Sequence, residues 1–371
     1  MGFKNNFIQD NLDALEDNMF IVSSDLFKKL NDKTQVITNS NNVTIRKRLT
    51  HSLEVASIGK YIAEQINLEN NMKIVNPSTV ENVGMIHDIG HPPLGHIGAK
   101  CLSEVFSKYN IQFDDNANSL VIFERYYPNL SRLAILSTIK YPFLLNKHGQ
   151  GLYDFQANYI NELNEIIKKQ TISGKPLNRT YESYIMELSD DISYLTGDLE
   201  DFIKHYEHHL DIELLNNIWN KLKLDKSFYF DLFSNLNKEN IELNVWRLRK
   251  LLIRDISFNI EENKFFFKSK TSILIIKILR EITMNLFVLK YSIRSDHDIA
   301  IMFRKYINLL ISNINKPSFL KKELSFNKKI VKEIIETEDN NKKLLLLSFV
   351  IAEMTDKQLM KKLKKHFLNF F

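Results

Sequence analysis

Apolar residues recur at helical spacing along most of the chain. Between residues 50 and 66, the positions that share one face are Leu53, Ala56, Ile58, Ile62 and Ile66. A period of three to four residues is that of an amphipathic helix. From residue 211 onward, similar segments alternate with short breaks of Asn, Asp and Ser. Because no two alternating runs are joined by a hairpin dipeptide, the pattern predicts a mainly α-helical chain without a β-hairpin.

The limits of one helix can be predicted closely. Asn76 followed by Pro77 is typical of an N-cap with proline at the first helical position. Apolar residues then continue to the end of the helix, which we expect at residues 87–88. Gly90 is expected to adopt the left-handed conformation beyond that end, and the two prolines that follow exclude another turn.

Longer helical patterns occupy the middle of the chain. Residues 120–141 and 155–170 are predicted to be helical, with a loop at 144–153 between them. Residues 180–209 have the pattern of one long helix, interrupted at most at Gly197. A domain boundary near residue 210 would follow.

The composition is typical of a globular protein in a reducing compartment. The single cysteine, Cys101, cannot form an internal disulfide. The start of the chain has no basic-then-apolar leader, and no run of 18 apolar residues occurs, so we expect a cytoplasmic protein without a membrane partner. The net charge of +5 permits anionic partners without demanding nucleic acid. The basic, aromatic tail at 361–371 is expected to end an amphipathic helix, with a phosphate- or membrane-touching tail as the alternative.

The stretch I-H-D-I-G-H-P-P-L-G-H-I-G at residues 86–98 concentrates candidate metal ligands. Neutral imidazoles and ionised carboxylates are natural ligands of divalent ions. Adjacent residues on a helix do not share a face, so His87 and Asp88 can reach one ion only where their helix ends. His51, in the first turn of another helix, is the third candidate.

A fourth ligand is expected from the stretch M-E-L-S-D-D-I-S-Y-L-T-G-D-L-E-D. Its candidates are Asp190, Asp191 and Asp198, because a carboxylate near a core is costly unless it is paired or binds a metal. Asp190, Tyr194 and Asp198 follow one helix face at intervals of four. A rival cluster is H-Y-E-H-H at residues 205–209, although its flanks are typical of a solvated surface.

Four motifs in order resemble a known family. They are F-K-K-L-N-D-K-T-Q-V at 27–36, R-L-T-H-S-L-E-V-A at 48–56, H-D-I-G-H-P-P-L-G-H at 87–96 and D-D-I-S-Y-L-T-G-D-L-E-D at 190–201. Weaker echoes are N-A-N-S-L, T-I-K-Y-P and A-E-M-T-D. The chain resembles the HD-domain deoxynucleoside triphosphate triphosphohydrolases, the dGTPase and dNTPase family. The resemblance implies an all-α fold, with an HD-type metal-dependent phosphohydrolase core at 1–210 and a helical C-terminal region at 211–371.

The resemblance assigns roles to individual residues. It implies four metal ligands: His51, His87, Asp88 and Asp190. The ion would be Mn²⁺, Fe²⁺ or Mg²⁺, with Zn²⁺ also open. The implied catalytic residues are His96, near the α-phosphate, and His91. The implied substrate contacts are Arg48, Gln35, Val36, His91, Lys140, Tyr141, Tyr194 and Asp198, of which Arg48, His91 and Tyr194 would contact phosphate and Gln35 and Val36 the deoxyribose.

One departure from the family pattern affects the chemistry. In the family motif G-H-x-G-E an acid partners the catalytic histidine, and here that position is Ala99. Without the acid, His96 loses a group that would orient it and raise its basicity. Glu104 is close in sequence, but nothing in the pattern makes it a substitute.

The expected activity is hydrolysis of a dNTP at the α-phosphorus, giving a deoxynucleoside and tripolyphosphate. Two alternatives remain open: a catalytically weakened dNTP-binding sensor or regulatory protein, and an HD phosphohydrolase that acts on another nucleotide. The resemblance further implies a homo-oligomer, a tetramer or a hexamer, with a nucleotide effector or single-stranded DNA as modulator. The C-terminal region is expected to contribute to that assembly.

Overall fold

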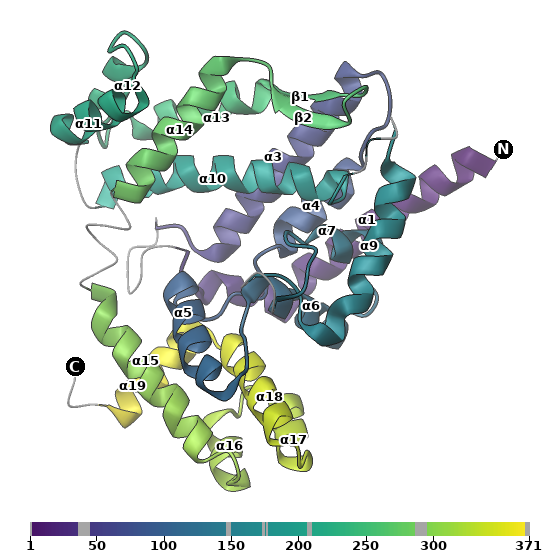
Figure 1. Cartoon of the computed structure of the whole chain (residues 1–371), viewed down its shortest axis with the longest axis vertical. Coiled ribbons are helices and arrows are strands. Elements are labelled where there is room, and N and C mark those ends of the chain that lie inside the picture. Colours follow the sequence, from purple (N-terminus) through teal and green to yellow (C-terminus); the bar gives the residue numbers. More distant parts are fainter. Residues whose placement is uncertain are drawn as a thin grey trace.

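The protein is almost entirely helical (Figure 1). The computed structural model describes residues 2–35, 45–145, 150–172, 175, 177–205, 210–285 and 295–367 of the 371. Within these ranges, strands occur only as one two-stranded sheet, and none of the helices combines the length and apolarity needed to cross a bilayer. The prediction of an all-α fold is confirmed.

The first part of the chain forms the helices that carry the motifs described above. They are α1 (Gly2–Ser23), α2 (Asp25–Lys29), η1 (Leu30–Asp32), α3 (Arg48–Glu69), α4 (Pro77–Ile86), α5 (Gly95–Phe106), η2 (Ser107–Tyr109), α6 (Asp115–Tyr126), α7 (Arg132–Ser137), η3 (Asp154–Gln156), α9 (Ala157–Gln170) and α10 (Tyr181–His205). The helices α3, α4 and α10 pack against one another. They form the frame on which the candidate site is built.

The second part of the chain divides into two groups of elements. The first group is α11 (Ile212–Leu222), α12 (Phe230–Ser234), α13 (Ile241–Arg254), β1 (Ile256–Asn259), β2 (Lys264–Phe267) and α14 (Lys270–Thr283). The second group is α15 (Ser295–Ser312), α16 (Pro317–Glu323), α17 (Lys328–Glu336), α18 (Asn340–Ala352) and α19 (Asp356–His366). In Figure 1 the first group lies above, beside α10, and the second lies below, around α5.

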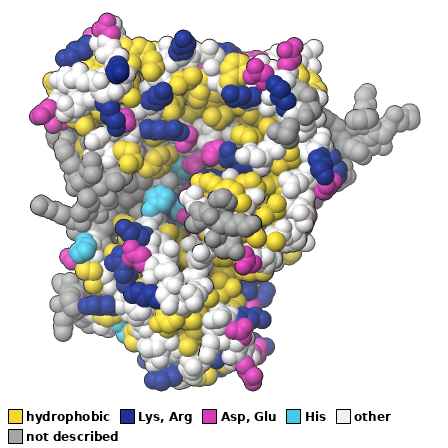
Figure 2. Space-filling model, viewed as in Figure 1, with side chains coloured by type: hydrophobic (Ala, Val, Ile, Leu, Met, Phe, Trp, Pro, Cys, Tyr) yellow, Lys and Arg dark blue, Asp and Glu magenta, His cyan; other side chains and the backbone are white. Residues whose placement is uncertain are grey.

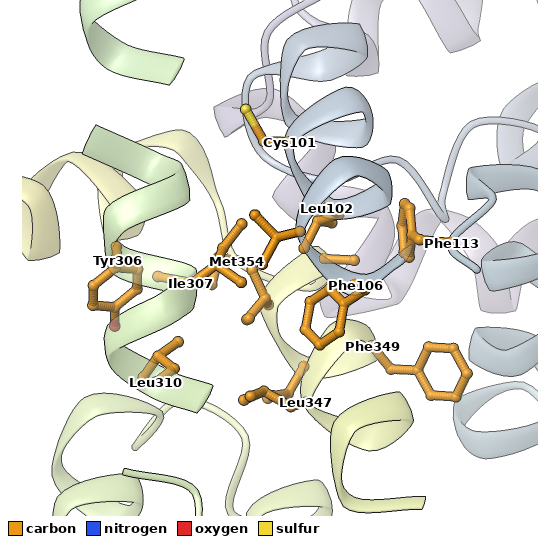
Figure 3. Packing of buried hydrophobic residues seen from close by; sticks show 14 of the residues in the cluster. Cys101, Leu102, Phe106, Phe113, Tyr306, Ile307, Leu310, Leu347, Phe349 and Met354 are labelled. Atoms are coloured by element: carbon orange, nitrogen blue, oxygen red, sulfur yellow. The ribbon is translucent and has the colours of Figure 1, made fainter. Parts of the chain in front are cut away.

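Each group shares a hydrophobic core with the first part of the chain. Ile62 of α3 and Leu279 of α14 belong to one buried cluster. Phe106 of α5 packs in another with side chains from α15 and α18, including Ile307 and Leu347 (Figure 3). The division at residue 210 stays a prediction, and burial of apolar surface joins residues on both sides of it.

Only the N-terminal end of α4 agrees with the prediction. The Asn76 side chain accepts hydrogen bonds from the backbone N–H groups of Ser78 (3.0 Å) and Thr79 (3.4 Å), as expected of an N-cap. At the other end, Gly90 is not left-handed; Leu94 and Gly95 are, with φ of 64° and 55°. Here the expectation was wrong.

Gly90 is required instead by a close approach between two segments. A Cβ at this position would lie 2.2 Å from the main-chain oxygen of Asp115, at the start of α6. The Asn118 side chain also donates to the Gly90 carbonyl oxygen at 2.7 Å, and the Gly90 N–H donates to Ser119 Oγ at 3.1 Å. The glycine therefore lets the turn after α4 lie against the first turn of α6.

The β-hairpin was also missed. β1 and β2 are antiparallel, with Ile256 opposite Phe267. Their connection, I-E-E-N, contains no glycine, and Asn263 takes the positive φ of 50° that closes the turn. Other expectations hold in part: residues 120–141 divide into the end of α6 and α7, and the long helix at 180–209 is unbroken through Gly197 as far as it is described.

Candidate active site

Three helix ends meet the middle of a fourth helix at the candidate site. α3 begins at Arg48, which places His51 in its first turn, while α4 ends at Ile86 and α5 begins at Gly95. The turn between α4 and α5 carries the remaining histidines, and α10 passes beside it with Asp190. Figure 2, which shows the molecule from the same side as Figure 1, has histidine side chains at the surface near the middle, between the upper and lower groups of helices.

The first cluster consists of His51, His87, Asp88 and Asp190. His51 Nε2 lies 3.0 Å and His87 Nε2 3.7 Å from the same Asp190 oxygen, Oδ1. Asp88 Oδ1 is 3.3 Å from His87 Nε2, and Asp88 Oδ2 is 4.0 Å from His51 Nε2. The two histidines and Asp190 offer atoms that all lie within 4.8 Å of one another. Two imidazoles and two carboxylates thus converge from three separate segments.

The hydrogen bonds around the histidines suit the binding of a divalent ion. His87 Nδ1 lies 2.8 Å from the Gly84 carbonyl oxygen, so this nitrogen donates and Nε2 carries the lone pair. His87 Nε2 is buried and has no hydrogen-bond partner among the described residues. His51 Nδ1 lies 3.3 Å from Ser193 Oγ, which leaves its Nε2 facing Asp190. Such outer contacts are those that orient metal-binding histidines, and nitrogen and oxygen donors without thiolate suit Mn²⁺, Fe²⁺, Mg²⁺ or Zn²⁺.

The charges of the cluster keep its carboxylates ionised. Burial would raise the pKa of Asp88, but His87, His91 and Arg48 outweigh it and hold the pKa well below its usual range. For Asp190, Lys140 and His87 likewise overcome burial and lower the pKa. Ionised carboxylates are the form that binds a cation.

The two histidines of the cluster differ in their affinity for a proton. Burial lowers the pKa of His51, which favours the neutral ligand form. Burial acts in the same direction on His87, but Asp88 and Asp190 outweigh it and raise the pKa of that ring. Because a ligand imidazole must be deprotonated, protons compete with an ion for His87.

Two cationic side chains flank the first cluster. Arg48 is only 1% exposed, and its Nη1 donates to Asp88 Oδ2 at 2.5 Å. Its Nε and Nη2 are buried without hydrogen-bond partners among the described residues. Lys140 Nζ donates to Asp190 Oδ2 at 2.8 Å. Guanidinium N–H groups that lack a partner beside such a candidate metal site are suited to bind phosphate oxygens.

The structure separates the three aspartates of α10 that the sequence left as candidates. The Asp191 side chain is 43% exposed and pairs with Arg280 at 2.6 Å. Asp198 is fully buried and accepts from Arg46 Nη2 at 2.7 Å. Burial raises the pKa of Asp198 to about 7, against the lowering effect of Arg46. Among the three, Asp190 is the one at the histidines.

The comparisons with known proteins agree with this geometry. The HD domain model matches residues 48–126. A deoxyguanosinetriphosphate triphosphohydrolase-like protein of Rickettsia rickettsii (strain Iowa) is 30% identical over 277 residues, covering 66% of this chain and 67% of the relative. A Rickettsia akari relative of the same name is 26% identical over 91% of this chain and 85% of its own, and one from Corynebacterium glutamicum (strain R) is 34% identical over 49% and 44%.

The chain belongs to the family of deoxyguanosinetriphosphate triphosphohydrolase-like proteins. It is therefore a member of a phosphohydrolase family with an HD domain. A solved structure, of a hypothetical protein from Aquifex aeolicus, aligns with 87% of this chain and 70% of that one, at 16% identity. Its TM-score of 0.40 is too low to inform the fold or the function.

The HD domain contains a second cluster next to the first, made of His91, His96 and Asp115. His91 Nε2 lies 2.8 Å from Asp115 Oδ2, and its Nδ1 lies 3.3 Å from Asp88 Oδ1. The rings of His91 and His96 meet edge to face, with centroids 5.9 Å apart. His96 is exposed, whereas His91 is buried. The second cluster thus adjoins the first through Asp88 and reaches solvent through His96.

The remaining predicted site residues have different surroundings. Gln35 is buried, and its backbone oxygen lies near Gly95 at the start of α5. Tyr141 is partly exposed, with its ring 6.0 Å from that of Phe143. Tyr194 is half-buried; burial and the nearby Asp198 raise its pKa. Their roles as substrate contacts stay predictions. Val36 and the rival cluster at 205–209 lie outside the residues whose side chains the structure describes.

Three residues at the site were missed or given no role at the level of sequence. Asp115 precedes the N-A-N-S-L motif, and Lys33 lies within F-K-K-L-N-D-K-T-Q-V. Asp356 belongs to A-E-M-T-D, more than 260 residues beyond the HD motif, yet it accepts from the Leu94 N–H at 2.8 Å. These residues lie in or next to the motifs noted in the sequence. Their contacts with the site could not be predicted, because they join segments that are far apart in the chain.

Proposed function

We propose that the protein is a metal-dependent dNTP triphosphohydrolase. The observation that carries the proposal is the first cluster, with two imidazoles and two carboxylates beside Arg48, whose Nε and Nη2 have no hydrogen-bond partner among the described side chains. The names of the relatives, deoxyguanosinetriphosphate triphosphohydrolase-like proteins, support a triphosphate of a deoxynucleoside as the substrate.

The residues around the cluster have distinct roles in the proposed reaction. His51, His87, Asp88 and Asp190 would hold a divalent ion, which supplies a Lewis acid for the phosphate and favours deprotonation of water. Arg48, Lys140 and His91 neutralise the triphosphate. They also orient it, so that the α-phosphorus faces the cluster.

The proposed step is a hydrolysis that balances without another reactant. A water oxygen forms a bond to the α-phosphorus, and the bond from that phosphorus to the 5′-oxygen breaks. The 5′-oxygen takes up a proton and leaves as the deoxynucleoside hydroxyl, while the three phosphates leave together as tripolyphosphate. His96, exposed next to His91, either donates that proton or positions the water.

The decisive experiment is product analysis with each dNTP and Mn²⁺, in water enriched in ¹⁸O. We expect tripolyphosphate that carries the label. Release of orthophosphate or pyrophosphate, or label in the deoxynucleoside, would contradict the proposal.

Adjacent aspartates on α10 offer a matched pair of variants. Asp190→Asn should lose bound metal and fall to background activity, because it removes a ligand carboxylate. Asp191→Asn removes a surface carboxylate that pairs with Arg280 and should keep both metal and activity. Equal effects of the two substitutions would argue against the assigned cluster.

A second candidate function is a dNTP-binding sensor with weakened catalysis. Ala99, in place of the acid found in the family motif, favours it. This candidate predicts saturable dNTP binding with no turnover across Mn²⁺, Fe²⁺, Mg²⁺ and Zn²⁺; robust release of tripolyphosphate excludes it. A panel of other nucleotides in the same assay tests the remaining alternative, an HD phosphohydrolase with another substrate.

We also propose that the protein acts in the cytoplasm as a homo-oligomer. The support is the family membership alone. Light scattering on the purified protein, with and without dNTP or single-stranded DNA, tests both the assembly and its modulators.

A further inference from the structure

The position at which the family motif has the acidic partner of His96 is Ala99, which has no carboxylate. It lies on α5, three residues after His96, and is packed against the core formed with α15 and α18. Glu104, the next acid along α5, is directed elsewhere, because it pairs with Arg304 of α15 at 2.7 Å. Neither position of α5 brings an acid to the histidines.

A carboxylate reaches the histidines from a different helix. Asp115 is the first residue of α6, and its Oδ2 lies 2.8 Å from His91 Nε2. One atom each from Asp115, His91 and His96 lies within 4.8 Å of the other two. Asp115 therefore contacts His91 directly and lies near His96.

The backbone around Asp115 fixes its position. The bonds from Asn118 to the Gly90 carbonyl and from the Gly90 N–H to Ser119 fasten the first turn of α6 to the HD turn. Asp114 caps α6 by accepting from the Ala117 N–H at 2.9 Å. The Asp115 carboxylate is thus held on rigid elements, as orientation of a catalytic imidazole requires.

The ring of His91 lies between two carboxylates, of which Asp115 makes the closer contact. Asp115 faces Nε2 and Asp88 faces Nδ1, at 2.8 and 3.3 Å. The contact at Nε2 orients the ring, because Nδ1 is buried without a hydrogen-bond partner among the described residues. The ring in turn meets that of His96 edge to face. A carboxylate orients an imidazole by accepting a near-linear hydrogen bond from a ring N–H.

We propose that Asp115 takes the place of the acid that Ala99 lacks, as the positioning residue that orients His91 directly and His96 beside it. The carboxylate partner of the histidine pair is then supplied by α6 instead of α5. The assignment of these histidines to the α-phosphate rests on the proposed function. Asp115 contacts His91, and in the proposed reaction it acts only through the histidines.

The test uses the whole 371-residue chain and three variants. Asp115→Asn removes the charge and keeps the size. Asp115→Asn combined with Ala99→Glu returns a carboxylate from α5, on the helix face of His96. Asp114→Asn is the matched control, because asparagine caps a helix as well as aspartate does. Thermal melting and metal content establish that each variant folds and keeps the first cluster.

We expect Asp115→Asn to lower kcat for tripolyphosphate release by about 10- to 100-fold, with little change in KM. The double variant should recover at least part of the loss, and Asp114→Asn should match the wild type. A merely structural role of Asp115 would not be rescued from α5. Full activity of Asp115→Asn, or failure of Ala99→Glu to restore any of it, overturns the proposal.

A second readout separates this proposal from the proposed function. In ¹⁵N-histidine spectra, with rings assigned through His91→Gln and His96→Gln, Asp115→Asn should shift the ring nitrogens of both histidines, and the double variant should move His96 back. If the wild type releases no tripolyphosphate, the proposed function fails while these shifts still support Asp115. An unshifted His96 ring overturns the role of Asp115 whatever the substrate is.

Discussion

Lys33 is a buried lysine whose surroundings lower its pKa. It is 3% exposed, and its ammonium group donates to the carbonyl oxygens of His91 and Ala352, the latter at 3.0 Å. Burial, reinforced by the charge of Arg48, lowers its pKa to about 7. In the unfolded chain the pKa is about 10.4. Between these values the unfolded state binds the extra proton, so stability should rise with pH.

The variant Lys33→Met should remove this dependence. Relative to the variant, the wild type should gain up to about 1.4 kcal/mol of unfolding free energy per pH unit between about pH 7 and 10. Below pH 7 the difference should be constant, because both states are then protonated. Chemical denaturation at pH 6 to 9.5 measures this, with Lys60→Met as a control for loss of an exposed lysine. Parallel curves for wild type and Lys33→Met would contradict the assignment.

At the scale of elements, α10 is fastened to the start of α3 through Arg46. The Arg46 guanidinium donates to Asp198 at 2.7 Å, to Asp201 at 3.0 Å and to the Ser193 carbonyl oxygen at 3.1 Å, all on α10. It lies directly over Gly197, where a Cβ would be 1.8 Å from Nη1. The glycine in this helix is thus required by packing rather than by a bend.

We expect Gly197→Ala to destabilise the protein. Alanine is favoured over glycine in a helix by about 1 kcal/mol, but the clash with Arg46 should reverse the sign and cost about 1–3 kcal/mol. The measurement is unfolding free energy in a double-mutant cycle with Arg46→Met. If Arg46 is the cause, Gly197→Ala becomes neutral or stabilising in that background; an undiminished cost there would refute the explanation.

The sequence predicts those features of this fold that depend on residues adjacent in the chain. The start of α4 followed from Asn76 and Pro77, since a side-chain cap and a fixed φ act locally. The β-hairpin was missed because its turn uses Asn263 at positive φ, without the glycine that marks such turns. Likewise the approach of Asp115 to His91 depends on α6 packing against Gly90, a contact between separate segments that no local pattern encodes.

At the scale of the whole molecule, the C-terminal end of the chain holds two loops of the candidate site. Asp356, the first residue of α19, accepts from the Leu94 N–H at 2.8 Å and from the Thr34 N–H at 2.7 Å, and also from the Thr34 hydroxyl. Thr34 precedes Gln35, and Leu94 lies between the histidines of the second cluster. The last helices therefore fix the relative position of two motifs that are about 60 residues apart in the chain.

Asp356→Ala should accordingly weaken both stability and catalysis. Loss of hydrogen bonds from a charged acceptor should cost about 2–4 kcal/mol, and release of the two loops should lower kcat/KM for dNTP by about tenfold or more, since small misplacements at a site are costly. Asp339→Ala is the matched control: Asp339 caps α18 from an exposed position, so its loss should cost about 1 kcal/mol and leave kcat/KM unchanged. Both quantities are measured at a temperature where every variant is folded. An Asp356→Ala protein that is less stable but fully active would show that the C-terminal helices stabilise the fold without positioning the loops that contact substrate.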